Sequence, residues 1–423
     1  MKITTADGSL TSSLVFPSLI LRFFLIFAFS LSGCTDSPSV EKEILIGEFV
    51  SKTGTEAQFG KSVEHGVQLA VDEINARGGI GRNSRNNGKA RVSDAKSGSG
   101  RIVRVITIET GGEKAKIEKA VRDFAKDSRV MAIIGEVSSE KSNWAAKIAQ
   151  AEKLPMISPA STNPNVTENG PFIFRACYID PFQGSAMATF AFKDLQLKRV
   201  MILRHDKSNY SLGLSEYFSE KFIKLGGEIL AEETYSTAQG LPDLVDQLAV
   251  IKRLKPQAIF IPVYYSEAAY LAKKIRGAGI KSVFLGGDGW DSPFLFDMDS
   301  KATEGVNKAV EGVYFSNHFS AEKDDPVVQK FVSKYKKEFG ETPDGTAAMG
   351  YDAARIALAA IQRAAERKKL NRDEVRKELS RTTGFEGVSG TITIDENRNA
   401  KKSIVVLKSE NKKFRYVKTI QPD

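Results

Sequence analysis

Val130-Met131-Ala132-Ile133-Ile134 is an unbroken apolar run that ends at Gly135. An apolar run of this length, closed by glycine, predicts a strand that is buried on both faces. Helical segments lie on either side of it, at 117–124 and 144–151, and a short strand follows at 155–158. Strands that alternate with helices in this way are typical of a parallel sheet covered by helices on both faces. The stretch therefore predicts an α/β fold.

The same alternation extends toward both ends of the chain and restarts once. Strands are expected at 44–49 and 102–108, with a helix at 65–76 between them. A second series is expected to contain strands at 199–203, 258–263 and 282–285 and helices at 213–225, 241–254 and 268–278. The remainder is expected to hold a strand at 312–315, helices at 326–339 and 349–367, and a strand pair at 391–394 and 403–408. Two such series predict two doubly wound parallel-sheet lobes.

The positive charge of the chain is spread along its length. The 423 residues carry a net charge of +9, and the densest basic stretch, 82–104, lies among Gly, Ser and Asn. A surface for single-stranded nucleic acid needs aromatic side chains among its charges for base stacking, and this stretch has none. We interpret it as a solvated loop inserted between a helix and a strand, and we expect no nucleic-acid partner.

An N-terminal apolar segment ends in Leu31-Ser32-Gly33-Cys34. The apolar run 23–29 is too short to cross a membrane, which takes about 20 apolar residues, and the pattern is typical of an export signal. We expect a signal peptide at 1–33 and a linker at 34–43. The ending resembles the lipobox of bacterial lipoproteins, which implies that Cys34 carries lipid; the alternative is an ordinary signal peptide with a chance cysteine. Cys177 is the only other cysteine, so no disulfide is expected once Cys34 is acylated.

Ligands of doubly wound sheets bind beyond the carboxyl ends of the strands, which restricts the search to a few loops. Ser139 follows the buried strand, where it could cap a helix and leave backbone N–H groups free for an anion. Ala160 and Thr162 lie in the next such loop, between Pro159 and Pro164. Together these loops offer donors for a small carboxylate. Taken alone, Ser139 is more simply explained as a helix cap.

The second series contributes an acid and aromatic residues at the same kind of position. Asp288 follows a predicted strand and lies between glycines, which bring the backbone close to a ligand; it could pair with an ammonium group. Tyr210 and Tyr264 follow two other strands, and Phe59 follows the first strand of the chain. The alternatives are that Asp288 is simply a turn aspartate and that the aromatic residues, like Trp290 after the third strand, belong to the core.

Motifs of catalysis and metal binding are missing from the sequence. The three histidines carry no sign of a Ser-His-Asp triad, and the chain lacks a Gly-x-Ser-x-Gly elbow, a His-Glu-x-x-His site and paired cysteines. We expect a binding protein that is not an enzyme and that uses no metal and no cofactor.

Several segments resemble the family of branched-chain amino-acid-binding proteins, the substrate-binding components of ABC importers. They are 46–60, which ends in Gln-Phe-Gly; 66–80, which ends in Ile-Asn-Ala-Arg-Gly-Gly-Ile; and 157–164, Ile-Ser-Pro-Ala-Ser-Thr-Asn-Pro. The segment 205–213 is similar to the start of the family's second lobe. The resemblance covers about 44–408 and implies the type I periplasmic-binding-protein fold, in which two lobes joined by a three-crossover hinge close on a ligand.

The resemblance also implies which residues contact the ligand. The matching positions are Phe59, Ser139, Ala160, Thr162, Tyr210, Tyr264 and Asp288. The loops at 139 and 160–162 would bind the ligand's carboxylate, Asp288 its ammonium group, and the aromatic residues its side chain. Asp288 stands where relatives often have the longer glutamate, and Glu140 and Lys141 add charge near the rim, so the identity of the amino acid stays open.

The family's crossovers would fall near Asp180, Glu311 and 387–390. We therefore expect a first lobe of 44–180 plus 311–386 and a second lobe of 181–310 plus 387–417. The expected function is capture of a small ligand, most simply an amino acid, and its delivery to the permease subunits of an ABC transporter. We expect the protein to be exported and held at the cell envelope by its lipid anchor, in the periplasm or on the outer face of the cytoplasmic membrane.

Three alternatives stay open. The same fold could serve a sensor that signals to a receptor, which neighbouring permease genes would argue against. The ligand could instead be an amide, urea or an aromatic acid, in which case binding would not need Asp288. A secreted hydrolase using Ser139 would show turnover that disappears in Ser139→Ala.

Overall fold

The structure is a computed structural model that describes residues 43–81, 100–237, 240–296 and 306–422. Cys34, the predicted signal peptide and most of the basic stretch lie outside these residues. Within the described residues, no helix combines the length and the apolar content that crossing a bilayer requires. The same residues contain no group of three or more His, Cys, Asp or Glu side chains that could hold a metal ion.

One sheet consists of five parallel strands in the order β2-β1-β3-β4-β5. Its strands are β1 (Glu43–Val50), β2 (Ile102–Glu109), β3 (Val130–Ile134), β4 (Met156–Ser158) and β5 (Ile173–Arg175). The helices beside it are α1 (Ala57–Ala76), α2 (Lys114–Lys126), α3 (Ser139–Ala151), α4 (Asn165–Glu168), α11 (Gly345–Glu366) and α12 (Arg372–Ser380).

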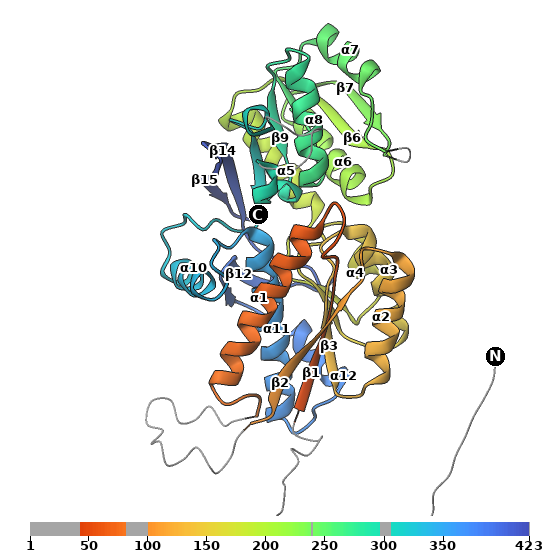
Figure 1. Ribbon diagram of the computed structural model, residues 1–423, viewed down its shortest axis with the longest axis vertical. Coiled ribbons are helices and arrows are strands. Elements are labelled where there is room, and N and C mark those ends of the chain that lie inside the picture. Colours follow the sequence, from red (N-terminus) through yellow and green to blue (C-terminus); the bar gives the residue numbers. More distant parts are fainter. Residues whose placement is uncertain (1–42, 82–99, 238–239, 297–305, 423) are drawn as a thin grey trace, which may run out of the picture. The chain divides into compact units, whose positions relative to one another are not determined.

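Helices cover both faces of this sheet. Successive side chains of a strand point to opposite faces, so Ile44 and Ile46 of β1 lie in one apolar cluster with α1 and α11, while Leu45 lies in another with α2 and α3. Figure 1 shows α1 and α11 on one side of β1–β3 and α2 and α3 on the other. Because β3 is buried on both faces, every position from 130 to 134 is apolar.

The other large sheet has seven strands in the order β15-β14-β10-β9-β8-β6-β7. They are β6 (Arg199–His205), β7 (Glu228–Tyr235), β8 (Ala258–Phe260), β9 (Val283–Gly286), β10 (Tyr314–Asn317), β14 (Ile404–Glu410) and β15 (Lys413–Ile420). One face packs against α5 (Asp180–Thr189) and α6 (Asn209–Lys224), and the other against α7 (Val245–Leu254) and α8 (Tyr265–Gly277). The described residues also include the short elements η3 (Phe190–Asp194), η4 (Asp288–Trp290), η5 (Pro293–Leu295) and α9 (Val306–Ala309) and the helix α10 (Pro326–Phe339).

The predicted fold class is confirmed. Both large sheets are doubly wound, and the chain passes between them three times: after β5, after β10 and before β14. The seven-stranded sheet is not wholly parallel, because β14 pairs antiparallel with both β10 and β15. The residue boundaries of the two lobes stay a prediction.

Two expectations about single elements were wrong. Residues 391–394 and 403–408 do not pair with each other: β12 (Gly390–Ile394) pairs with β11 (Phe385–Gly387) and β13 (Ala400–Lys401), whereas β14 joins the large sheet. Helix α1 begins at Ala57, so Phe59 lies in a helix instead of a loop. The sequence did not predict strand β7, because its positions are mostly part-buried or exposed and it lacks an apolar run.

Helices α1 and α11 approach each other closely at a glycine. A Cβ placed on Gly66 of α1 would lie 2.2 Å from the carbonyl oxygen of Ala347 and 2.7 Å from the backbone nitrogen of Tyr351. Gly350 of α11 meets the backbone of Val63 in the same way. A contact of helix backbone against helix backbone leaves no side chain that could move aside.

We predict that Gly66→Ala lowers the free energy of unfolding by at least about 1–3 kcal/mol, because one of the two helices must shift. Gly277→Ala is the matched control, since Gly277 ends α8 and has no atom within 4 Å of the place that an alanine Cβ would take; it should gain about 0.5–1 kcal/mol. Urea unfolding of both variants measures the difference. Equal stability of the two would contradict the close helix contact.

Candidate functional site

A small, narrow cavity of about 10 Å³ lies where strand ends of both large sheets meet. Its lining consists of Phe59, Val137, Ala160, Tyr210, Tyr264, Asp288, Gly289, Asn317, His318 and Thr346. Five of the seven predicted ligand residues therefore come together: Phe59, Ala160, Tyr210, Tyr264 and Asp288. Ser139 and Thr162 are buried and do not line the cavity.

Neutral donors hold the carboxylate of Asp288 in place. Its Oδ1 accepts from the amide of Gln183 at 2.7 Å and from the hydroxyl of Tyr210 at 2.9 Å. Its Oδ2 lies 3.0 Å from Nε2 of His318. Burial lowers the pKa of His318 to about 4, although the bond to Asp288 opposes that shift. His318 is thus neutral at pH 7, and Nε2 is the ring nitrogen that carries the proton it donates to the carboxylate.

The aromatic residues form a connected wall from both sheets. The ring of Tyr264 stacks on Tyr210 with centroids 4.9 Å apart and meets Phe59 edge-on at 5.9 Å. Tyr265 meets Phe59 at 5.0 Å, and its hydroxyl accepts a bond from the backbone of Gln58 at 3.4 Å. Trp290 is not part of this wall: it is fully buried and donates to the carbonyl of Ile261 at 2.9 Å.

The loop that leads into α3 forms the opposite part of the site through Val137. Ser138, not Ser139, is the residue that precedes the helix, so the expected cap at Ser139 was wrong. Ser139 is the first helical residue, and its hydroxyl accepts from the backbone of Asn163 at 3.3 Å. The Tyr264 hydroxyl lies against this helix end: burial raises its pKa well above the usual value, while the Ser138 side chain and the Ser139 backbone act to lower it.

Three serine hydroxyls tie the two loops of the five-stranded sheet together. Ser158 and Ser161 donate to the carbonyl of Glu136 at 2.9 and 3.1 Å, and Ser142 bonds the same carbonyl at 3.0 Å. These contacts fix the loop after β3 relative to the loop after β4, which carries Ala160. The donors on which a ligand would depend therefore belong to a rigid wall.

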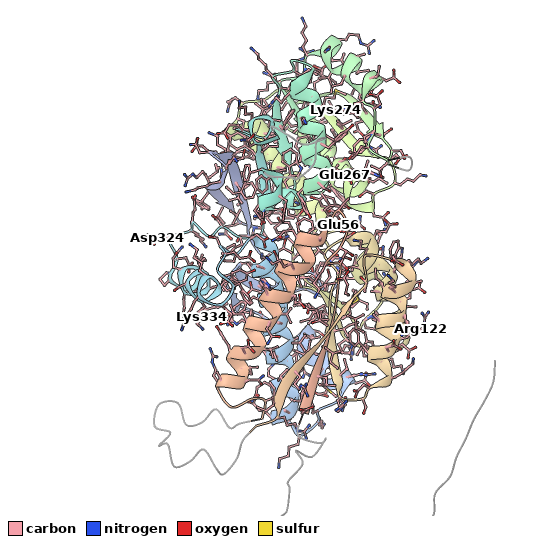
Figure 2. The ribbon with its side chains drawn as sticks, in the orientation of Figure 1. Glu56, Arg122, Glu267, Lys274, Asp324 and Lys334 are labelled. Carbon is pink, nitrogen blue, oxygen red and sulfur yellow. The ribbon has the colours of Figure 1, made fainter. Side chains whose placement is uncertain are left out.

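Of the two charged residues expected near the rim, Glu140 and Lys141, the lysine forms an ion pair. The ammonium of Lys141 lies 3.1 Å from the carboxylate of Glu56, and both side chains are largely buried. Glu56 lies at the end of α1 that approaches α8, on which Figure 2 labels Glu267. Because Lys141 is paired, it does not supply a free cation to the cavity.

Sequence reasoning missed Gln183, Asn317, His318 and Thr346. Asn317 and His318 stand at the carboxyl end of β10, so the rule that selected the other loops would have found them had that end been searched. Gln183 lies inside α5 and Thr346 inside the first turn of α11. No strand-end pattern points to residues of that kind.

A lysine is buried directly behind His318. The ammonium of Lys402 contacts the carbonyl of His318 and the sulfur of Met349, both at 3.4 Å, and the residue is 2% exposed. Burial lowers the pKa of Lys402 to about 8, against the attraction of Asp352. Its charge is therefore held in an unfavourable environment.

A larger cavity of about 400 Å³ shares Asn317 with the first. Two acids in its lining are already bonded: Asp291 accepts from the backbone of Gly345, and Asp344 accepts from the hydroxyl of Ser62 at 2.7 Å. None of the predicted ligand residues lines it. The smaller cavity is therefore the candidate site.

Comparison with known proteins agrees with this fold. A family model described as periplasmic binding protein matches residues 43–413. The chain belongs to this family.

Relatives of this periplasmic binding protein cover nearly all of its described part. The Leu/Ile/Val-binding protein homolog 1 of Brucella abortus is 26% identical over 360 residues, which is 85% of this chain and 88% of that protein. The leucine binding protein LivK of Thermotoga maritima superposes with a TM-score of 0.77 and 35% identity, covering 90% of this chain and 99% of its own. LivJ of Streptococcus pneumoniae, solved with isoleucine, has a TM-score of 0.77 and 27% identity over 90% and 100%.

For this periplasmic binding protein we predict that Lys402→Met raises the free energy of unfolding at pH 7. The pKa of Lys402 falls from 10.5 to about 8 on folding, which corresponds to a gain of up to about 3 kcal/mol on removing the charge.

The gain should shrink as pH rises from 8 toward 10.5, because the wild-type lysine then loses its proton in the folded protein first. Chemical unfolding at pH 7 and pH 9.5 measures this trend. A variant less stable than wild type at both pH values would contradict the interpretation.

Proposed function

We propose that the protein captures an α-amino acid as a zwitterion, with an aliphatic branched-chain or related side chain, and delivers it to the permease of an ABC transporter. The ligand's ammonium group pairs with Asp288, and its carboxylate meets the loops that carry Ser139, Ala160 and Thr162, of which Ala160 lines the cavity. Phe59, Tyr210 and Tyr264 enclose its side chain. No bond is made or broken: contacts from both sheets favour a closed arrangement that the permease recognises.

The observation that carries this proposal is a carboxylate in a cavity without a cation. Asp288 lines the cavity, its side chain is 9% exposed, and the other lining residues are aromatic, aliphatic or neutral polar. Its three donors, Gln183, Tyr210 and His318, are also neutral. A buried charge is costly unless an opposite charge accompanies it. A ligand ammonium group would supply that charge.

The same electrostatics argue against a ligand that is only an anion. A benzoate-like acid would add a second negative charge to the cavity and leave Asp288 without a cationic partner. A zwitterion suits both ends of the site: its ammonium group can pair with Asp288, and its carboxylate is favoured near the N-terminal end of α3. The amino acids named for the leucine-binding and isoleucine-bound relatives agree with this choice.

Export and lipid anchoring are part of the proposal and rest on residues 23–34. Solute-binding proteins of this family are partners of membrane permeases, and a tether at Cys34 would keep the protein beside one. A single acyl chain binds membranes only marginally, so firm anchoring takes more than one chain on the cysteine.

We predict that leucine, isoleucine or valine raises the unfolding temperature of residues 35–423. A ligand at about 100 times its Kd adds roughly 2.7 kcal/mol to stability. Asp288→Asn should weaken binding at least about thirtyfold, because it removes one partner of a buried charge pair. Thermal shift followed by calorimetric titration measures both effects.

Asp206→Asn is the control for this prediction. Asp206 also follows a strand of the seven-stranded sheet, but it does not line the cavity, so its variant should bind like wild type. Binding that survives Asp288→Asn unchanged, or a shift with aromatic acids alone, would overturn the amino-acid assignment.

We predict that Cys34→Ala moves the protein from the membrane fraction to the released fraction of cells. Loss of the proposed acylation site should also abolish incorporation of labelled palmitate. Cys177→Ala is the matched control, because Cys177 is buried and free; that variant should stay membrane-bound. Release of the wild-type protein together with Cys34→Ala would argue for an ordinary signal peptide.

A further inference from the structure

Asp180 stands at the first passage of the chain between the two large sheets. It is the first residue of α5 and is 0% exposed. Its backbone nitrogen donates to the carbonyl of Thr162 at 2.9 Å, which ties it to the loop proposed to bind the ligand's carboxylate. A shift in the position of Asp180 is therefore transmitted directly to Thr162.

The side chains of this pair are left without proper hydrogen bonds. Both carboxylate oxygens of Asp180 and the hydroxyl oxygen of Thr162 are buried and make no hydrogen bond of good geometry, although the side chains of Thr162 and Asn163 come close enough to Asp180 to favour its ionised form. A Cβ placed on Gly213 would lie 2.9 Å from Oδ2 of Asp180, so α6 closes off that side. Unpaired buried polar atoms are rare, and these lie beside the proposed carboxylate site.

The charges around Asp180 do not neutralise it. Arg175 on β5 attracts it, but its guanidinium donates to Ser161 at 2.6 Å and to Pro164 at 3.1 Å. Asp288, at the other end of the ligand site, repels it. The remaining titratable groups that sense its charge are Tyr217 on α6 and Cys177, which follows β5.

Burial raises the pKa of Asp180 to about 7, although Thr162, Asn163 and Arg175 favour the ionised form. The group is thus poised to gain or lose a proton near neutral pH. A new negative charge placed beside it would shift that balance toward the protonated form.

We infer that Asp180 is a positioning residue that takes up a proton when the ligand's carboxylate binds and thereby turns the Thr162 hydroxyl toward the ligand. The inference rests on the proposed function, since it requires a ligand carboxylate at Thr162. It assigns to the site a coupling between ligand capture and pH.

The argument follows from the single proton of a hydroxyl group. When Asp180 is ionised, it can only accept, so the Thr162 hydroxyl donates to it and presents a lone pair to the ligand's carboxylate. When Asp180 is protonated, its O–H donates to Thr162, and the Thr162 proton is free for the ligand. The proton comes from solvent, and the carboxylate is bound only when Asp180 is neutral.

The test is a calorimetric titration of the wild-type protein with the amino acid selected by thermal shift. If the bound protein keeps its proton, Kd should rise about thirtyfold from pH 6 to pH 8.5, with uptake of about one proton at pH 8. Proton uptake is read from titrations in buffers of different ionisation heat. A flat profile without uptake would overturn the inference while leaving the proposed function intact.

Asp180→Asn should lose the pH dependence, because its amide can donate to Thr162 at every pH. Thr162→Val should lose it too, and it serves as the second variant if Asp180→Asn does not fold. Glu48→Gln is the matched control: burial raises the pKa of Glu48 to about 8, and its partner is Thr107 on β2. This control should keep the wild-type profile.

The remaining outcomes separate the two claims. A wild-type slope that persists in Asp180→Asn, or disappears in Glu48→Gln, would overturn the role of Asp180. Failure of every amino acid to bind wild type at pH 6 would instead overturn the proposed function. A measurement without ligand does not depend on amino-acid binding. The unfolding temperatures of Asp180→Asn and wild type should diverge from pH 5 to pH 8, because the wild-type carboxyl group must ionise while it is buried.

Discussion

The shared direction of the strands is the constraint on which the site depends. Parallel strands place all their carboxyl ends at one edge of a sheet, and the loops that leave that edge must lie side by side. Val137 and Ala160 follow β3 and β4 of one sheet, while Asp288 and His318 follow β9 and β10 of the other. A cavity with donors on one wall and an acid on the other is the outcome of that geometry.

In this cavity, neutral side chains surround the carboxylate of Asp288. Gln183, Tyr210 and His318 satisfy the lone pairs of Asp288 without cancelling its charge. A cation among these donors would have removed any reason for a ligand to bring one. Lys402 stands one layer behind His318 and is too far back to pair with the acid, so its charge only moderates the local field. The arrangement keeps an attraction available for a ligand.

Much of the fold and of the site could be predicted from the sequence, because its clearest patterns have direct physical causes. Strand β3 is apolar at every position since both its faces are covered, and the ends of α1 and α6 are marked by pairs of glycine. The strand-end rule brought five cavity residues together. The search for apolar runs missed β7, because β7 is an edge strand without such a run. The strand-end rule missed Gln183, because this residue reaches the site from inside a helix. Which side chains meet across the two sheets depends on packing that no local pattern encodes.

The contact between α1 and α11 also governs when the protein can fold. Gly66 and its partners at 347–351 are separated by most of the chain, so one layer of the five-stranded sheet is missing until α11 has been synthesised. Contacts between such distant segments form slowly. The N-terminal part therefore leaves the ribosome without a complete core, and its apolar face stays open during synthesis. In the export that we propose for this chain, the late synthesis of α11 would keep the polypeptide unfolded for longer.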